Sequence, residues 1–183
     1  MLMRSENGKR YSETTSHLMA KETTKEKIIK ELKRIEEDSL YSSKGHFYAA
    51  QSWEKWHYKL GIPATIFSAL AGVSAIAEQN VLAGVIAFCV ATVAGLITFL
   101  NPNEKASVHR NAGNEYNDLK NKSRILYEIE ANSLDEKVLT EKMKELDKAR
   151  SELNKKSPQI PKGSFEQARR GIEEGEASYK ADV

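Results

Sequence analysis

The 183-residue sequence has only one cysteine, Cys89. A single thiol cannot form an intramolecular disulfide or a zinc cluster built on cysteines, and it fits a reducing compartment or a lipid environment. Neither sign of charge dominates, because the formal net charge is only +2. No basic tail indicates direct nucleic-acid binding. Residues 1–59 contain no apolar run, so the sequence predicts no N-terminal signal peptide.

Side chains that could carry out catalysis are few. His46, His57 and His109 are spread over two segments without the spacing of metal ligands, and we interpret them as surface or interface histidines. No glycine-rich phosphate loop follows a strand, and the acidic residues 173–176 lack the alternating oxygen ligands of a calcium loop. The sequence therefore predicts that the protein is not an enzyme and has no catalytic, metal or cofactor site.

Apolar residues, in contrast, are concentrated in one part of the chain. The mean hydropathy is −0.57, yet residues 60–77 and 81–100 contain no charged side chain. At about 1.5 Å per residue, each run gives a helix of roughly 27–30 Å, which matches the hydrocarbon core of a bilayer. A soluble helix of this length normally carries charges on one face. The sequence therefore favours a membrane hairpin over a soluble bundle that buries two helices on all sides.

The predicted fold is all-α: a membrane protein with a two-transmembrane helical hairpin and long amphipathic cytoplasmic helices before and after it. Lysine and arginine flank both spans and are absent from the turn at residues 78–80. Both termini are therefore expected on the cytoplasmic side of the bacterial inner membrane. The expected parts are a polar, mobile N-terminus (1–20), lead-in helices (21–59), the hairpin (60–100) with spans 60–77 and 81–100, and a cytoplasmic helical region (101–183).

Local signals suggest where the helices begin and end. Gly45 is expected to break or kink the lead-in, and Pro63 to lie in the first turn of the first span, where proline costs least. Asn101 and Pro102 are expected to end or kink the second span. Two capping-box patterns predict helix starts, Ser133 with Glu136 and Ser164 with Gln167.

Small side chains gather on one face of each span when residues advance by about 100° per position. Such faces let helix backbones approach closely in lipid, where no hydrophobic effect drives association. The two small faces could pack against each other within the hairpin, or they could also contact neighbouring subunits. Two helices cannot enclose an aqueous path, so any pore requires a homo-oligomer. The helix-packing or pore-facing candidates are Ala64, Thr65, Ser68, Gly72 and Ala75 in the first span, and Ala83, Ala87, Ala91, Ala94, Gly95 and Thr98 in the second.

Two further groups of side chains allow alternative interpretations. Trp56 and Tyr58 lie where an interfacial aromatic belt would lie, or they pack between cytoplasmic helices. The other group consists of basic residues that could bind a phosphate between the cytoplasmic helices: Arg110, Lys120, Lys122 and Arg124. Glu115 and Asp118 are interleaved with them and favour an ordinary solvated face.

Four features in a fixed order resemble the SLATT family of two-transmembrane effector domains. They are the hairpin itself, the lead-in SSKGHFYAAQSWEKWHYKLGIP, the segment LNPNEKASVHRNAGNEYNDLKNKSR after the second span, and the terminal SPQIPKGSFEQARRGIEEGE. The resemblance covers roughly residues 25 to 180, and no single motif carries it alone.

The resemblance implies a membrane effector of an antiviral conflict system. It further implies activation by a nucleotide signal or by a partner protein, such as a nucleotide-signal synthase, a nucleotide sensor or a reverse transcriptase. Activation would lead to pores in the inner membrane and abortive infection. The alternatives are a membrane-anchored helical scaffold that docks a cytoplasmic partner, and a nucleotide sensor without pore activity.

Overall fold

The structure is a computed structural model that describes residues 22–77 and 80–179. All regular structure within these residues is helical, which confirms the predicted all-α fold class. The expected mobile N-terminus (1–20) and residues 78 and 79 of the expected turn lie outside the described residues.

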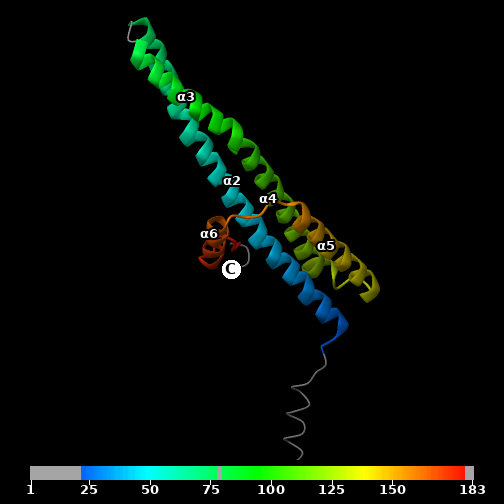
Figure 1. The fold of residues 1–183 in the computed structure, drawn as a ribbon. Helices are drawn as coiled ribbons and strands as arrows, with labels where there is room; N and C mark the ends of the chain where they lie inside the picture. The colour runs from blue at the N-terminus through cyan, green and yellow to red at the C-terminus, as the bar shows by residue number, and fades with distance from the viewer. Residues whose placement is uncertain (1–21, 78–79, 180–183) are drawn as a thin grey trace, which may run out of the picture.

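One helix, α2 (Thr24–Ile76), runs along the whole length of the folded chain (Figure 1). Its 53 residues span about 80 Å at 1.5 Å per residue. It begins with a capping box that the sequence analysis missed: the Glu26 backbone N–H donates to the Thr23 hydroxyl at 3.2 Å, and the Thr23 N–H donates to the Glu26 carboxylate at 2.8 Å. The lead-in and the first span therefore form one continuous helix.

Two expectations about interruptions in this helix are wrong. Gly45 neither breaks nor ends α2; instead, it admits the side chain of Ile160, because a Cβ at Gly45 would lie only 3.0 Å from Ile160 Cδ1. Pro63 lies in the interior of α2 and not in a first turn. An interior proline leaves a backbone carbonyl without its usual N–H donor. Lipid-embedded helices tolerate this when neighbouring groups hydrogen-bond to that carbonyl instead.

The second span is α3 (Asn80–Leu100), and it ends where the sequence predicts. Asn101 has φ 41° and ψ 58°, a left-handed conformation in which asparagine is enriched among non-glycine residues. Pro102 then opens α4 (Pro102–Ile125), which runs along the N-terminal half of α2 and continues into a short π-helix, η1 (Leu126–Glu130).

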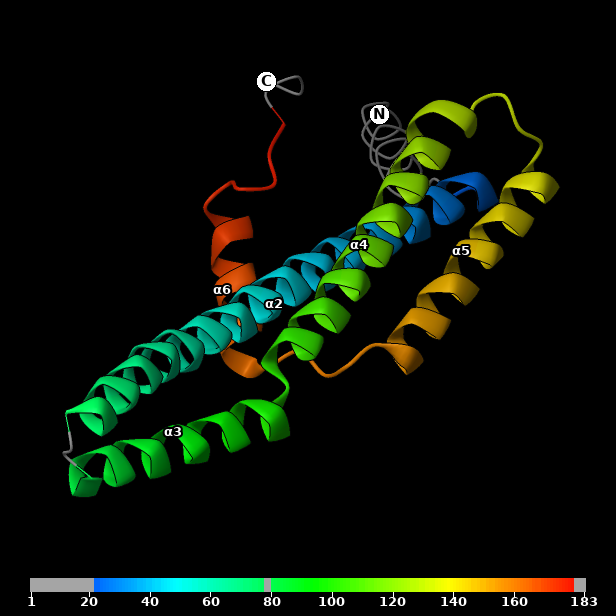
Figure 2. The ribbon, with the colours of Figure 1, turned by 90° about the horizontal axis from the view of Figure 1, so that it is seen from above.

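Two more helices complete the part of the chain outside the hairpin. Figures 1 and 2 place α5 (Glu136–Lys156) beside α4, and α6 (Lys162–Glu173) across α2 from both. Apolar side chains from α2, α4, η1 and α5 form two buried clusters between these helices. The first cluster is Ile28, Leu32, Leu126, Ala131 and Leu139, and the second is Ile35, Tyr116, Leu119 and Leu153.

Neither predicted capping box is present in this part of the chain. The cap residue of α5 is Asp135, and the Ser133 hydroxyl instead donates to the Glu130 carbonyl at 2.9 Å. The cap residue of α6 is Pro161, so Ser164 lies inside the helix and is buried. A proline next to a helix start fixes the backbone there, and this overrides the weaker serine signal three residues later.

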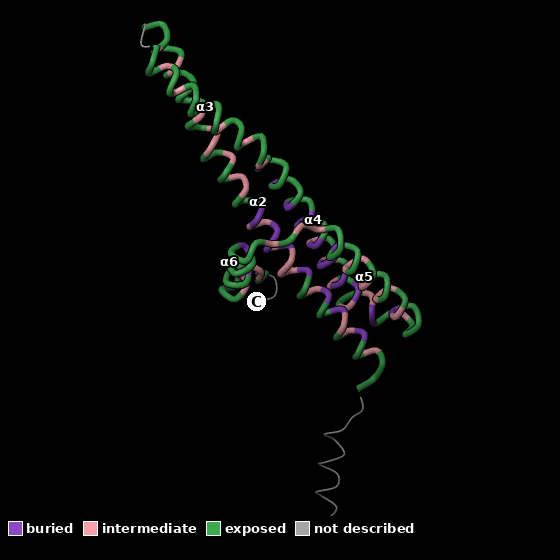
Figure 3. The backbone as a smooth tube through the Cα atoms, in the orientation of Figure 1, coloured by how far each residue is buried: buried purple, intermediate pink, exposed green. Residues whose placement is uncertain are grey.

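Helices α2 and α4 approach closely because small residues line their contact. The Ser43 hydroxyl donates to the Gly113 carbonyl at 2.9 Å, and the Ser123 hydroxyl donates to the Leu32 carbonyl at 2.7 Å. A Cβ at Gly113 would lie 2.8 Å from the Phe47 ring, so glycine is required for this approach. We call residues 24–59 of α2 together with α4 the stalk. Figure 3 shows that the buried residues lie in the stalk and in the helices packed on it, and not in the hairpin.

Candidate functional site: the membrane hairpin and the stalk

The hairpin has no core of its own. No residue of α3 is buried, and none of the residues in the apolar window of either candidate span is buried (Figure 3). Both spans are long enough and apolar enough to cross a membrane. A soluble monomer rarely exposes a continuous apolar surface of this extent, whereas a bilayer would cover it.

Four hydroxyls within the spans are satisfied inside their own helices. Each of these four donates to the carbonyl four residues earlier, and such internal bonds let lipid tolerate a hydroxyl side chain. The pairs are Thr65 with Gly61 at 2.9 Å, Ser68 with Ala64 at 2.8 Å, Thr92 with Phe88 at 2.9 Å and Thr98 with Ala94 at 3.0 Å.

The small face of α3 is not the face that is half-buried against α2. The half-buried positions follow a spacing of three and four residues, and all but one carry bulky side chains: Ala83, Ile86, Val90, Val93, Ile97 and Leu100. The other small-face candidates of this span, Ala87, Ala91, Ala94, Gly95 and Thr98, are exposed. The two faces are centred about 110° apart around the helix. The small face of α3 is therefore not the surface that packs against α2 within one chain.

The small face of the first span is used in part. Ala64 is half-buried, whereas Thr65, Ser68, Gly72 and Ala75 are exposed. A Cβ built at Gly72 or at Gly95 would meet nothing within 4 Å. Most small-face candidates on both spans are thus free surface in a single chain.

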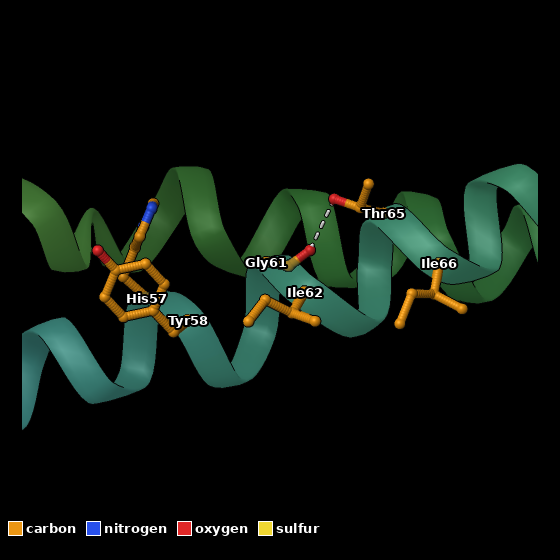
Figure 4. A pocket seen from close by; sticks show the side chains of 6 residues that line it. All are labelled: His57, Tyr58, Gly61, Ile62, Thr65 and Ile66. Carbon is orange, nitrogen blue, oxygen red and sulfur yellow. Dashed lines mark hydrogen bonds between the residues drawn. The ribbon is translucent and has the colours of Figure 1, made fainter.

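The aromatic residues at the start of the first span face outward. Trp56 and Tyr58 are both exposed and do not pack between the helices outside the hairpin, and the Lys59 ammonium lies 5.8 Å from the centre of the Trp56 ring. An open groove of about 370 Å³ lies at this level along α2, and Figure 4 shows the side chains that line it. His57 and Tyr58 lie at one end of it and Ile66 at the other. The groove thus runs from polar to apolar side chains where the span begins.

Two histidines that seemed unrelated in the sequence meet inside the stalk. His46 of α2 and His109 of α4 are only 2% and 5% exposed, and their Nδ1 atoms lie 2.9 Å apart. The ring of Tyr116 stacks on His46 at a centroid distance of 5.5 Å. Of the two interpretations of these histidines, surface or interface residues, the first is therefore wrong, because both lie in the interface between α2 and α4. Because a neutral imidazole carries one N–H, one ring donates through Nδ1 and the other accepts.

Acid is expected to weaken the stalk through this histidine pair. Burial, followed by the His109 ring, lowers the pKa of His46 from its ordinary value to about 4, and burial lowers the pKa of His109. The unfolded chain takes up these protons near pH 6.5, whereas folded His46 stays neutral until about pH 4. Within this window the unfolded state binds more protons, so a falling pH favours unfolding, and above the window the pair contributes no pH dependence.

The thermal unfolding midpoint of the detergent-solubilised protein measures this effect. The midpoint should fall as the pH drops through this window, and a His46→Gln variant should lose less of its midpoint over the same range. Equal losses in both proteins would assign the acid sensitivity to other groups.

The four basic residues considered for a phosphate separate into two groups. Arg110 pairs with the Glu54 carboxylate, and Lys122 pairs with Asp118 at 2.7 Å on a solvated face. Lys120 and Arg124 instead lie against Tyr179, near the end of the described chain.

The sequence analysis missed Lys44, whose ammonium lies 3.1 Å from the Glu176 carboxylate. No local pattern could have indicated this contact, because 132 residues separate the two side chains.

The described residues contain no group of three or more histidine, cysteine, aspartate or glutamate side chains placed to hold a metal ion. In comparisons with known proteins, a family model described as "SMODS and SLOG-associating 2TM effector domain family 4" matches residues 15–182. Neither the comparison with curated proteins nor the comparison with solved structures found a match.

Proposed function

The chain belongs to the family of SMODS and SLOG-associating 2TM effector domains, and from this membership we propose that it oligomerises and opens a pore in the inner membrane of a bacterium under attack. The cell would stop growing or die, which fits an antiviral conflict system. The opening would follow a nucleotide signal or contact with a partner protein. No catalytic step is assigned to the chain itself.

One observation supports the oligomerisation in this proposal. The small face of α3, centred on Ala91, stays exposed after α3 has packed against α2 through another face. Small faces on lipid-embedded helices favour close helix–helix packing. A second copy of the hairpin can therefore pack there, and several copies together can surround a path that two helices cannot enclose.

We further propose that both flanks of the hairpin are cytoplasmic. The packing of α4 on the N-terminal half of α2 supports a position of both flanks on the same side of the membrane. Lys55 and Lys59 before the first span and Lys105 after the second favour the cytoplasmic side.

Thiol labelling on intact cells tests this orientation, in a Cys89→Ser background. A cysteine at Asn80 should react with a membrane-impermeant thiol reagent, and a cysteine at exposed Glu145 should react only after lysis. The reverse pattern would place the flanks outside, and equal labelling of both before lysis would argue against a membrane hairpin.

Dye leakage tests the pore itself. Purified protein reconstituted into liposomes at increasing protein-to-lipid ratio should release an encapsulated dye with a steep dependence on that ratio, because opening requires several copies. Protein that inserts fully and releases no dye under any activating condition would support the membrane-anchored scaffold instead.

A further inference from the structure

The last described residues, 174–179, lie across the stalk, and we call them the strap. The Glu176 carboxylate lies 3.1 Å from the Lys44 ammonium and accepts hydrogen bonds of 3.1 Å from the Tyr48 hydroxyl. At the other end of the strap, the Tyr179 hydroxyl accepts a hydrogen bond of 3.0 Å from Lys120. The strap thus presents a carboxylate to α2 and an aromatic ring to α4.

Two cationic side chains of the stalk, Lys120 and Arg124, lie under the Tyr179 ring, and the Glu36 carboxylate is near enough to act on its hydroxyl. Lys120 is only 8% exposed, and the Arg124 guanidinium lies 4.8 Å from the centre of the Tyr179 ring. Neither side chain forms an ion pair with any carboxylate in the part of the chain that the structure describes. A buried ammonium is costly unless an anion compensates it, and a neutral phenol does so poorly. The Lys120 ammonium accordingly lowers the pKa of the Tyr179 hydroxyl.

A cavity of about 160 Å³ lies between the strap, α2 and α4. Its walls include Ser43 and Lys44 from α2 and Asn117 and Lys120 from α4, so hydrogen-bond donors line it from both helices. Pockets that hold drug-sized ligands measure roughly 300–1,000 Å³. A ligand of that size could therefore enter only by displacing the strap.

We propose that the cleft under the strap binds a small soluble ligand that carries a phosphate beside a planar ring, and that the strap occupies the cleft as an internal substitute for it. The phosphate takes the place of the Glu176 carboxylate between Lys44 and Tyr48. The planar ring takes the place of the Tyr179 ring on Arg124. Lys120 lines the same cavity and serves either group.

The position of the cleft favours a soluble ligand over a lipid headgroup. Lys44 precedes the start of the first span by 16 residues, which corresponds to about 24 Å along a continuous helix. The headgroup region does not extend so far from the hydrocarbon core.

Displacement of the strap would remove a connection between the two stalk helices that continue into the hairpin. The role of this event as a trigger rests on the proposed pore, but binding itself does not. Calorimetry on detergent-solubilised protein therefore tests binding, and dye leakage from liposomes tests the pore, so either hypothesis can be contradicted without the other.

Calorimetry with adenosine monophosphate as the probe tests the site. A Glu176→Gln, Tyr179→Leu double variant removes the internal substitute and should bind the probe about tenfold more tightly than the unaltered chain, because the competent state is no longer the minor one. Adding Lys120→Gln, or separately Lys44→Gln, should abolish this gain. Adding Lys155→Gln, an exposed change on α5, should leave the gain intact. Unfolding midpoints confirm that each variant is folded.

Three results would overturn the proposal. The first is equal affinity of the double variant and the unaltered chain for the probe. The second is a gain in affinity that survives both Lys120→Gln and Lys44→Gln. The third is equally tight binding of short-chain phosphatidylglycerol, which would assign the cleft to a lipid headgroup. Inorganic phosphate and adenosine should each bind more weakly than adenosine monophosphate, because each supplies only one of the two groups that the cleft accommodates.

Discussion

Replacement of Ala91 with leucine is expected to abolish both the oligomer and the toxicity of the overexpressed protein. Ala91 lies near the middle of the second span, about ten residues from either end, on the exposed small face of α3. Leucine adds three carbons to a surface on which neighbouring helices must approach closely. Interhelical polar contacts in lipid are worth about 1–2 kcal/mol. A forced separation along the whole face should cost more, because many dispersion contacts lengthen together.

Leu96→Ala is the matched control for this change. Leu96 is exposed on another side of α3, where we expect it to meet lipid, so its truncation should leave assembly, insertion and toxicity nearly unchanged. Crosslinked oligomer in membranes and colony survival should be measured for both variants at matched expression. If Ala91→Leu stays toxic while Leu96→Ala does not, the two faces are assigned the wrong way round. If neither variant changes toxicity, the hairpin is only an anchor.

The hairpin could be predicted from the sequence because its signal is local. The absence of charge over residues 60–77 and 81–100 is read directly from the chain, and the lipid supplies the rest of the environment. The continuity of α2 through Gly45 could not be predicted in the same way. Gly45 is glycine because Ile160, from a distant connector, packs against it, and local helix propensity does not contain that contact.

The candidate sites in the stalk show the same limit more strongly. His46 and His109 are 63 residues apart, and Lys44 and Glu176 are 132 residues apart. Helical periodicity cannot predict a contact between residues so far apart in the sequence. Only the packing of α4 and the strap onto α2 brings each pair together. On α3 the small face was visible in the sequence, but the sequence could not show that Ile86, Val90 and Val93 form the half-buried face instead.

Truncation of Leu139 to alanine is expected to produce a large loss of stability in the helices outside the hairpin. Leu139 of α5 is 0% exposed and belongs to the cluster with Ile28, Leu32 and Leu126, which joins α5 to α2 and η1. Leucine-to-alanine changes in such cores cost about 2–5 kcal/mol, because the lost transfer free energy is added to that of the cavity left behind.

The preceding residue supplies the control, because Val138 is 39% exposed and Val138→Ala should change the free energy of unfolding by about 0.5 kcal/mol or less. The loss in Leu139→Ala should also be regional. Lipid or detergent covers the hairpin, whereas α5 depends on its contacts with α2, α4 and η1, including the ion pair of Arg150 with Asp38 at 2.8 Å. Hydrogen exchange of the detergent-solubilised protein should therefore accelerate in α5 and in the first turns of α2, and stay slow in α3. Equal acceleration in α3 would show that the stalk and the hairpin unfold as one cooperative unit, and equal losses in the two variants would show that Leu139 does not anchor α5.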